Sequence, residues 1–538
     1  MLDYLFENAY VADGTGGPIQ KRSVGVKNGK ICMIHNEIAE EATHVIRLGE
    51  NEILCPGFID SHAHSEKFLY SDRRVTPKLL QGVTTEVSGN CGLGLAPYNP
   101  RYQKESENNF AMMAAGLTMS NHWDLPETFA GFLEQIEALR PEINTAFYVA
   151  HGALRIAVKG YDGSPLTREE SQKMDALLRE AMEAGAIGIS TGLVYVPGSY
   201  ATQEEVEHLC AIVKEYNGIY ATHMRDEGER VIEAVKESIE VARKTGVKLL
   251  ISHHKVTGMK LGHLVPEIHR LVREARNEGL TVFMDQYPYN CGASTLTTTI
   301  PYKYADGGIG KLLERISDPT IAKQIRQDIL HNDGTWQNPL DSTGFDGMSV
   351  LSAPNCEESV GKSLTELSDM WHIDPIDVIF KLLRENNGSV FVLLKFMKDE
   401  TVEQIFQSDL VSVCTDSILL GDNYTVHPRG YATYPRILGR FVREKGLVPL
   451  EKAVCKMTSM PADMFLMRNK GRIQEGLDAD IVVFDKNTII DAADYVNPRV
   501  KNPGISYVMV NGEISVDHGV ITDRYRGKVL RGGVDCNV

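Results

Sequence analysis

Two histidines separated by one residue follow an apolar run early in the sequence. The stretch PGFIDSHAHSE spans residues 56–66, so His62 and His64 come directly after the apolar run 53–59. In an extended strand, side chains at positions i and i+2 point to the same face, so both imidazoles can approach one metal ion. Two surface histidines in a loop are the simpler alternative. A Pro-Gly break and a strand end favour the metal site, because catalytic groups occupy such strand ends in α/β barrels.

Two further histidines occupy equivalent positions. The apolar segments IYATH and LLISH end at His223 and His253, and each histidine stands where the next loop begins. A single histidine at a strand end is more often structural than a ligand. Four of them at the ends of three strands would meet at a barrel mouth, so together they predict a zinc site. His254 points to the opposite side of its strand and is left out of this set.

A cysteine and an aspartate extend the set of candidate ligands. Cys91 follows the β-branched strand in GVTTEVSGNCG, where a thiolate can bind zinc and bridge two metal ions. Its alternative role is that of a small buried hydrophobic residue. Asp416 ends the strand DLVSVCTDS, and a carboxylate there can bind a metal-held water and shuttle its proton. An aspartate that caps a helix or stabilises a turn is the alternative.

Helices that end at glycine alternate with apolar strands through the middle of the chain. The four helical patterns are REESQKMDALLREAMEAG and the segments 204–217, 229–245 and 265–278, and the strands that follow them are AIGISTG, IYATHM, VKLLISHH and LTVFMDQYPY. Four such units in series imply right-handed parallel crossovers. We therefore predict an α/β fold, a TIM-like (β/α)8 barrel.

The two ends of the chain hold short alternating segments separated by Gly and Asn turns. We predict that residues 1–55 and 466–538 together build one small β-sandwich domain, and that residues 56–465 form the catalytic barrel. The segment at about 296–350 is richer in loop signals, as in HNDGTWQNPLDSTGFDG. We interpret it as an insertion that covers the barrel mouth, although an ordinary surface excursion explains the same pattern.

Composition excludes several classes of protein. The chain of 538 residues carries a net charge of -16 and has no dedicated basic patch, which argues against nucleic acid or an anionic membrane as partner. Nine scattered cysteines form neither a disulfide framework nor a CxxC zinc motif. No apolar run is long enough to span a membrane, and the first residues lack the pattern of a signal peptide. We therefore expect a cytoplasmic protein.

The motifs, taken together, resemble those of the amidohydrolase superfamily and, within it, the N-acyl-D-amino-acid deacylases, or D-aminoacylases. They occur in family order over nearly the whole chain: PGFIDSHAH, GVTTEVSGNCG, THMRDE, ISHHK, DQYPY, TDS with HPRGYATYPR, and GRIQEGLDADIVVFD. Many relatives carry a carboxylated lysine at the end of the fourth strand, but AIGISTGLVYVPG offers none. Cys91 fits the deacylase arrangement, in which a cysteine takes the bridging position.

The resemblance implies a role for each candidate ligand. Cys91, His223 and His253 would hold one tight Zn2+ ion. A second, weaker metal position would be framed by His62, His64 and Asp416. In that family Asp416 would act as the general acid and base.

The resemblance also implies a small-molecule substrate that bears a carboxylate. Lys255 and Tyr287, with Ser294 and Arg429 as weaker candidates, would meet that carboxylate. Lys255 stands two residues beyond His253 and so faces the same side, and an ammonium group suits a carboxylate; a solvated lysine is the alternative. Arg225 follows His223 by two and is either a substrate clamp or a structural partner of a neighbouring acidic residue, Asp226 or Glu227.

The activity implied by the resemblance is zinc-dependent hydrolysis of the amide bond of N-acyl-D-amino acids, giving a carboxylate and a free D-amino acid. A cyclic-amide hydrolase of the hydantoinase or dihydroorotase type would use the same barrel, but the missing lysine counts against it. A deaminase of the superfamily would leave Cys91 without a role. A catalytically silent relative that only binds ligands is a further alternative, and the complete set of ligand types argues against it.

Overall fold

Eight parallel strand positions close a barrel in the computed structural model, which describes the whole chain except residues 70–74, 112–124, 422–424, 523–524 and 538. The strands are β6 (Phe58–Asp60), β7 (Val83–Ser88), β8 (Asn144–Phe147) continued by β9 (Val149–Ala150), β10 (Gly188–Gly192), β11 (Ile219–His223), β12 (Lys248–Ile251), β13 (Val282–Gln286) and β17 (Val411–Val413). Neighbours pair in parallel, and a parallel bridge between Ala63 and Ser417 joins the last strand to the first. The predicted TIM-like barrel is confirmed.

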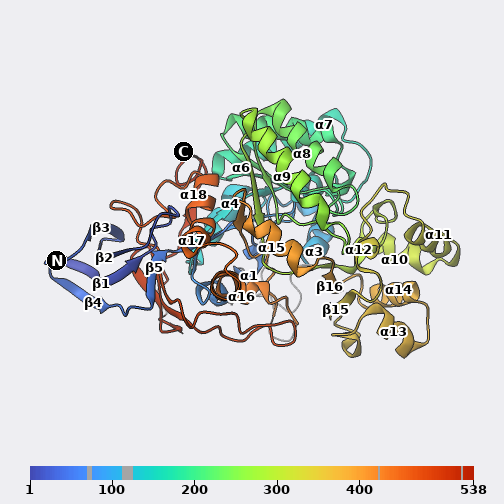
Figure 1. The fold of residues 1–538 in the computed structure, drawn as a ribbon. Helices are drawn as coiled ribbons and strands as arrows, with labels where there is room; N and C mark the ends of the chain where they lie inside the picture. Colours follow the sequence, from blue (N-terminus) through green and yellow to red (C-terminus); the bar gives the residue numbers. More distant parts are fainter. Residues whose placement is uncertain (70–74, 112–124, 422–424, 523–524, 538) are drawn as a thin grey trace.

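The four predicted helix and strand units form as expected. Their helices are α6 (Arg168–Ala184), α7 (Gln203–Glu215), α8 (Val231–Thr245) and α9 (Val265–Asn277), and they cover the outside of the strands (Figure 1). Thr167 begins α6 with a capping box, which satisfies otherwise unpaired backbone N–H groups. Gly246 ends α8 at a φ of 72°, a conformation that glycine adopts without a steric penalty. These local signals fix where each helix begins and ends.

Strands from both ends of the chain form one β-rich sheet beside the barrel (Figure 1). Its members are β1 (Leu2–Val11), β2 (Gln20–Lys27), β3 (Lys30–His35), β4 (Ala42–Arg47), β5 (Glu52–Pro56), β18 (Ile481–Asp485), β19 (Ile505–Val510), β20 (Glu513–Asp517) and β21 (Val520–Ile521). The antiparallel pair of β5 and β18 joins the two halves. Residues 466–538, which we predicted to belong to the small β-domain, also contain β22 (Val529–Leu530). This strand pairs with β8 of the barrel instead.

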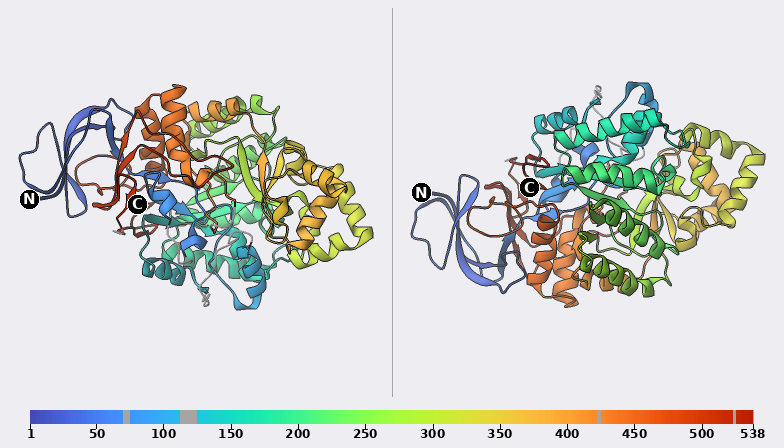
Figure 2. Two further views of the ribbon diagram at one scale, coloured as in Figure 1. Left: turned by 90° about the horizontal axis from the view of Figure 1, so that it is seen from below. Right: turned by 90° about the horizontal axis from the view of Figure 1, so that it is seen from above.

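A long excursion separates β13 from β17 and lies at the opposite end of the molecule from the β-rich sheet (Figures 1 and 2). We call residues 291–395 the excursion. Its three antiparallel strands are β14 (Cys291–Thr295), β15 (Met348–Ser352) and β16 (Phe391–Lys395), and its helices are α10 (Ile309–Ser317), α11 (Pro319–Leu330), α12 (Pro339–Thr343), α13 (Leu364–Trp371) and α14 (Pro375–Glu385). The excursion is longer than the predicted 296–350 insertion. Its sheet is complete only with β16, which lies between β14 and β15 but comes last in the sequence.

The barrel interior below the strand ends is apolar. Ile59, Val87, Ala146, Ile187 and Ala221 form part of one buried cluster drawn from five different strand regions. Such packing holds the strand ends at fixed positions, because close-packed interiors resist deformation.

Among the described residues, no helix combines the length and apolar character that crossing a membrane requires.

Candidate metal centre and active site

The carboxyl ends of five barrel strands bring together all the side chains that the sequence singled out as metal ligands or general base. These are His62, His64, Cys91, His223, His253 and Asp416, and all of them are buried. Cys91, His253 and Asp416 have φ values of 54°, 37° and 48°. Positive φ is uncommon for residues other than glycine, and such strained residues cluster at functional sites. Three of the candidate ligands thus share this backbone conformation at the barrel mouth, where all six meet.

The thiol of Cys91 lies at the centre of the histidine cluster. Its Sγ is 3.3 Å from Nε2 of His62, 3.3 Å from Nε2 of His253 and 3.8 Å from Nδ1 of His223. Two ligands held roughly 2.0–2.3 Å from one tetrahedral zinc ion are about 3.5 Å apart. Sulfur and imidazole nitrogen are also the donor types that zinc prefers. The donor set therefore fits zinc both in chemistry and in spacing.

Glycines and a serine let the Cys91 loop pack onto the end of β10, the fourth barrel strand. A Cβ at Gly192 would lie 2.0 Å from the carbonyl oxygen of Cys91, so only glycine fits there. The hydroxyl of Ser190 accepts a hydrogen bond of 3.0 Å from the backbone N–H of Gly92. The thiol thus reaches the site beside a strand that carries no lysine.

The carboxylate of Asp416 contacts the histidines with one oxygen and an arginine with the other. Oδ1 is 3.4 Å from Nε2 of both His62 and His64, and Oδ2 is 2.7 Å from Nη1 of Arg429. Burial acts to raise the pKa of Asp416, but Arg429, His253, His64 and His62 together hold that pKa well below its usual range. The carboxylate is therefore ionised at neutral pH and able to accept a proton.

Burial sets the protonation of the other donors. It lowers the pKa of His223 to about 3 and the pKa of His62 well below its usual value, so both imidazoles are neutral and keep a lone pair for a metal. Burial, with Asp416 nearby, raises the pKa of the Cys91 thiol well above its usual value. A cysteine of this kind becomes a thiolate when a cation binds it, because the ion stabilises the negative sulfur.

A buried ion pair ties the ends of β6 and β17 together. Asp60 accepts hydrogen bonds from the backbone N–H of Thr415, at 2.8 Å, and from its hydroxyl, at 2.6 Å. Lys78 in α2 (Thr76–Leu79) donates to Asp60 and, at 2.7 Å, to the Thr415 hydroxyl. This network fixes the loop that carries Asp416 relative to the strand before His62. Sequence reasoning missed it, since no short spacing links Lys78 to Thr415.

The two main candidates for binding a substrate carboxylate lie beside the metal ligands. Nζ of Lys255 is 2.8 and 2.9 Å from the two carboxylate oxygens of Glu227 and 2.6 Å from Nδ1 of His253. The ring of Tyr287 is buried, with Nζ of Lys255 5.8 Å and Cζ of Arg429 4.7 Å from its centroid. All of these side chains line one pocket together with His64, Cys91, His223 and Asp416.

Arg225 lines the same pocket but uses its guanidinium elsewhere. Its Nη2 donates to Oε1 of Glu237 and to the carbonyl oxygen of Ala201, each at 3.1 Å. The acidic partner is therefore Glu237 rather than either of the neighbours that the sequence suggested. Glu237 lies twelve residues away on α8, where helix packing and not sequence adjacency brings it close.

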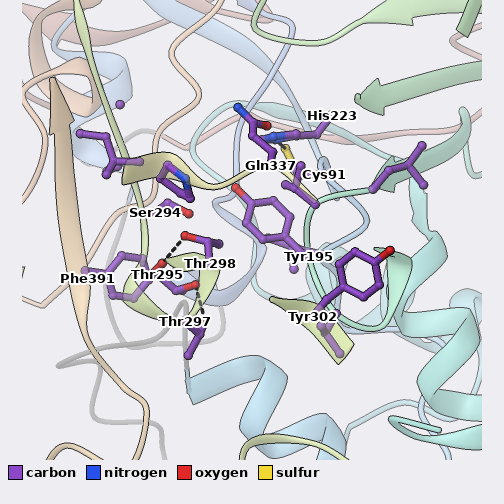
Figure 3. A pocket seen from close by; sticks show the side chains of 18 of the residues that line it. Cys91, Tyr195, His223, Ser294, Thr295, Thr297, Thr298, Tyr302, Gln337 and Phe391 are labelled. Atoms are coloured by element: carbon purple, nitrogen blue, oxygen red, sulfur yellow. Dashed lines mark hydrogen bonds between the residues drawn. The ribbon is translucent and has the colours of Figure 1, made fainter. Parts of the chain in front are cut away.

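Much of the pocket wall comes from the excursion (Figure 3). The labelled wall residues include Ser294, Thr295, Thr297, Thr298, Tyr302 and Phe391. Tyr195 lines the same pocket as Ser294, and its ring packs edge-on against His223 with centroids 5.1 Å apart. Tyr195 follows the fourth strand in LVYVPG, so its position after a strand end was the signal that could have identified it.

Known proteins resemble this chain over most of its length. Residues 407–516 match a family model described as Amidohydrolase family. A D-aminoacylase of Alcaligenes xylosoxydans xylosoxydans is 33% identical over 98% of this chain and 97% of its own, and an N-acyl-D-glutamate deacylase of the same organism is 33% identical over 95% and 93%. The crystal structure of an N-acyl-D-glutamate deacylase from Bordetella bronchiseptica, complexed with zinc and a phosphonate inhibitor, superimposes with a TM-score of 0.82 at 29% identity, covering 98% of this chain and 99% of the other.

Proposed function

The chain belongs to the N-acyl-D-amino-acid deacylase family of the amidohydrolases, and we propose that it uses bound zinc to hydrolyse the amide bond of N-acyl-D-amino acids. The products are a carboxylate and a free D-amino acid. The observation that most supports this proposal is the spacing of Cys91 Sγ from three imidazole nitrogens at the mouth of the barrel, with an ionised Asp416 beside them.

We assign the metal ligands as the donor chemistry suggests. Cys91, His223 and His253 would hold one tightly bound zinc ion, and His62, His64 and Asp416 would frame a second, weaker position. When bound, zinc lowers the pKa of water towards neutrality and polarises the amide carbonyl.

Asp416 supplies the proton transfers in this proposal. Its Oδ1 accepts a proton from the water that attacks the amide carbon, and returns that proton to the nitrogen as the C–N bond breaks. Arg429 holds Oδ2 at 2.7 Å and thereby keeps Oδ1 directed to the histidines. One carboxylate therefore acts first as the general base and then as the general acid.

Lys255 and Tyr287 are the groups that we propose for the α-carboxylate of the substrate, with Ser294 and Arg429 in support. The ammonium of Lys255 is buried and lies in the pocket beside His253, so a carboxylate bound to it would place the neighbouring amide close to the metal ligands. Arg225 already pairs with Glu237, so we assign it to the pocket wall.

The test is amine release from paired N-acetyl-D- and N-acetyl-L-amino acids with several side chains. The zinc-loaded protein is compared with a Cys91→Ala variant, and zinc content is measured in both. We expect turnover of the D-substrates only, and loss of both turnover and tightly bound zinc in the variant. Zinc-loaded protein that releases no amine from any of these substrates would contradict the proposal.

A further inference from the structure

One buried carboxylate contacts both of the histidines assigned to the tight zinc ion. Oε2 of Glu227 is 3.3 Å from Nε2 of His223, and Oε1 of Glu227 is 3.2 Å from Nδ1 of His253. The side chain of Glu227 is 4% exposed, so water does not compete for its oxygens. Glu227 follows His223 by four residues in THMRDE and lies in the loop after β11.

The two histidines divide their ring nitrogens in the same way. His223 directs Nδ1 to Cys91 and Nε2 to Glu227, whereas His253 directs Nε2 to Cys91 and Nδ1 to Glu227. A neutral imidazole that binds a metal through one nitrogen carries its hydrogen on the other. Each histidine that uses its Cys91-facing nitrogen as a ligand therefore presents an N–H group to Glu227.

We propose that Glu227 is the positioning residue of the metal centre, accepting one hydrogen bond from each zinc-ligating histidine and so fixing the tautomer and the ring plane of both. The inference rests on the proposed function for the assignment of those ligands. A carboxylate has one oxygen for each ring, which an amide cannot reproduce, because only one of its two polar atoms accepts a hydrogen bond.

Lys255 balances the charge of this carboxylate. Its Nζ donates to both oxygens of Glu227, at 2.8 and 2.9 Å. Nζ also lies 2.6 Å from Nδ1 of His253, a contact that requires a bare Nδ1. In the proposed zinc-bound form Nδ1 would carry the hydrogen, so Lys255 would keep Glu227 as its partner and lose its contact with the imidazole. The assignment thus couples the histidine tautomer to the direction of the Lys255 ammonium.

The backbone around Glu227 is held from both sides. Its N–H donates to Oε1 of Gln337 at 3.2 Å, and its carbonyl accepts from the N–H of Thr257 at 2.6 Å. Gln337 in turn donates to the Thr257 hydroxyl at 3.0 Å. The loop that carries Glu227 is thus fixed by Thr257, in the loop after β12, and by Gln337, in the excursion. We infer that its carboxylate is oriented before a metal ion binds. Preorganised partners of this kind typically contribute 10–100-fold to metal affinity.

The experiment measures zinc affinity directly, by competition with a chromophoric chelator, in Glu227→Gln, Glu227→Asp and the unaltered protein. The absorption spectrum of the Co2+-substituted forms reports ligand geometry. Glu205→Gln is the matched control, because Glu205 is also a largely buried carboxylate on a histidine, 2.8 Å from Nε2 of His151, but is not among the metal-site residues. Far-UV circular dichroism checks folding in each variant.

We expect zinc to bind about 10–100-fold more weakly to both Glu227 variants, with a changed Co2+ spectrum, while the control matches the unaltered protein. Glu227→Asp keeps the charge beside Lys255 but is too short to reach both rings. Unaltered affinity in Glu227→Asp would overturn the two-ring role and leave only a charge requirement, and unaltered affinity in Glu227→Gln would overturn the inference altogether. If the unaltered protein bound no zinc, the proposed function would be the part that fails.

Discussion

The charge of Asp416 is the residue property on which the proposed chemistry depends most directly. Asp416→Asn keeps the shape and a partner for Arg429 but removes the basic oxygen. We expect the turnover number to fall by about 10²–10⁴-fold, the usual contribution of a positioned acid or base. The tight zinc ion should stay bound, because Asp416 is not one of its assigned ligands. Steady-state kinetics with metal analysis tests this, and zinc-loaded Asp416→Asn with normal turnover would remove Asp416 as the base.

A second carboxylate gives a pH-dependent prediction away from the active site. Glu205 accepts hydrogen bonds of 2.7 and 2.6 Å from Arg155 and lies 2.8 Å from His151. Burial acts to raise its pKa, but His151 and Arg155 lower it to about 2, from an ordinary value of 4.5. The unfolded chain therefore binds the proton first as the pH falls. The stabilisation from Glu205 is complete above pH 4.5 and is lost on acidification towards pH 2.

Between pH 5 and pH 3, the free energy of unfolding should fall by about 2 kcal/mol more in the unaltered protein than in Glu205→Gln. Urea unfolding at pH 5, 4 and 3 measures this difference. Parallel pH dependences in the two proteins would show that Glu205 takes up its proton at the same pH in the folded and unfolded states.

At the scale of elements, the excursion determines what the pocket offers to a substrate side chain. Its contribution to the wall is mainly hydroxyl and apolar, as with Thr297, Thr298 and Phe391. Three cationic side chains also line the described part of the pocket, and each has a carboxylate partner: Arg225 with Glu237, Lys255 with Glu227, and Arg429 with Asp416. Lys255 and Arg429 are already assigned to the α-carboxylate of the substrate, and Arg225 is held by Glu237. A second carboxylate on the substrate would therefore be desolvated without a cation of its own, which is costly.

We accordingly expect N-acetyl-D-leucine and N-acetyl-D-phenylalanine to have kcat/KM values at least about tenfold above those of N-acetyl-D-glutamate and N-acetyl-D-aspartate, since losing one charge-assisted pairing costs about 1.5–3 kcal/mol. Initial rates on the four substrates decide the order. A preference for either acidic substrate would mean that one of the three paired cations exchanges its partner for the substrate.

The elements that could be predicted from the sequence are those with local signals. Helices such as Val231–Thr245 can be predicted from the spacing of their apolar residues and from the glycine that ends them. The strands that follow such helices end at His223 and just before His253, which places both histidines at one rim of the barrel. The spacing of His62 and His64 and the glycines around Cys91 are equally local. Much of the barrel and the proposed ligands followed from such patterns.

The remaining features depend on contacts between distant segments. The pair of Lys78 and Asp60 acts on Thr415, more than 300 residues away, and nothing in the sequence near Lys78 signals it. The pairing of Arg225 with Glu237 arises because α8 packs beside the loop after β11. The length of the excursion was underestimated, because β16 pairs with β14 from far along the chain. No local sequence pattern signals that pairing.

At the scale of the whole molecule, the β-rich sheet and the barrel are connected by two strands that follow one another directly, β5 in the sheet and β6 in the barrel. β5 ends at Pro56, and β6 begins at Phe58 after a single glycine. The backbone N–H of Gly57 donates to the carbonyl of Asp480, so the junction also contacts the chain just before β18. The sheet therefore anchors the first barrel strand, and with it the loop that carries His62 and His64.

The pairing of β5 with β18 has a consequence for how the protein is made. More than 400 residues separate the two strands, and at about 5–20 residues per second a ribosome needs roughly 20–90 seconds to add them. Throughout that interval the nascent chain exposes the open edge of β5, which is the kind of edge that other chains can pair with. β17, which closes the barrel, also emerges late. Both parts of the molecule therefore complete their folding together, after nearly all of the chain has left the ribosome.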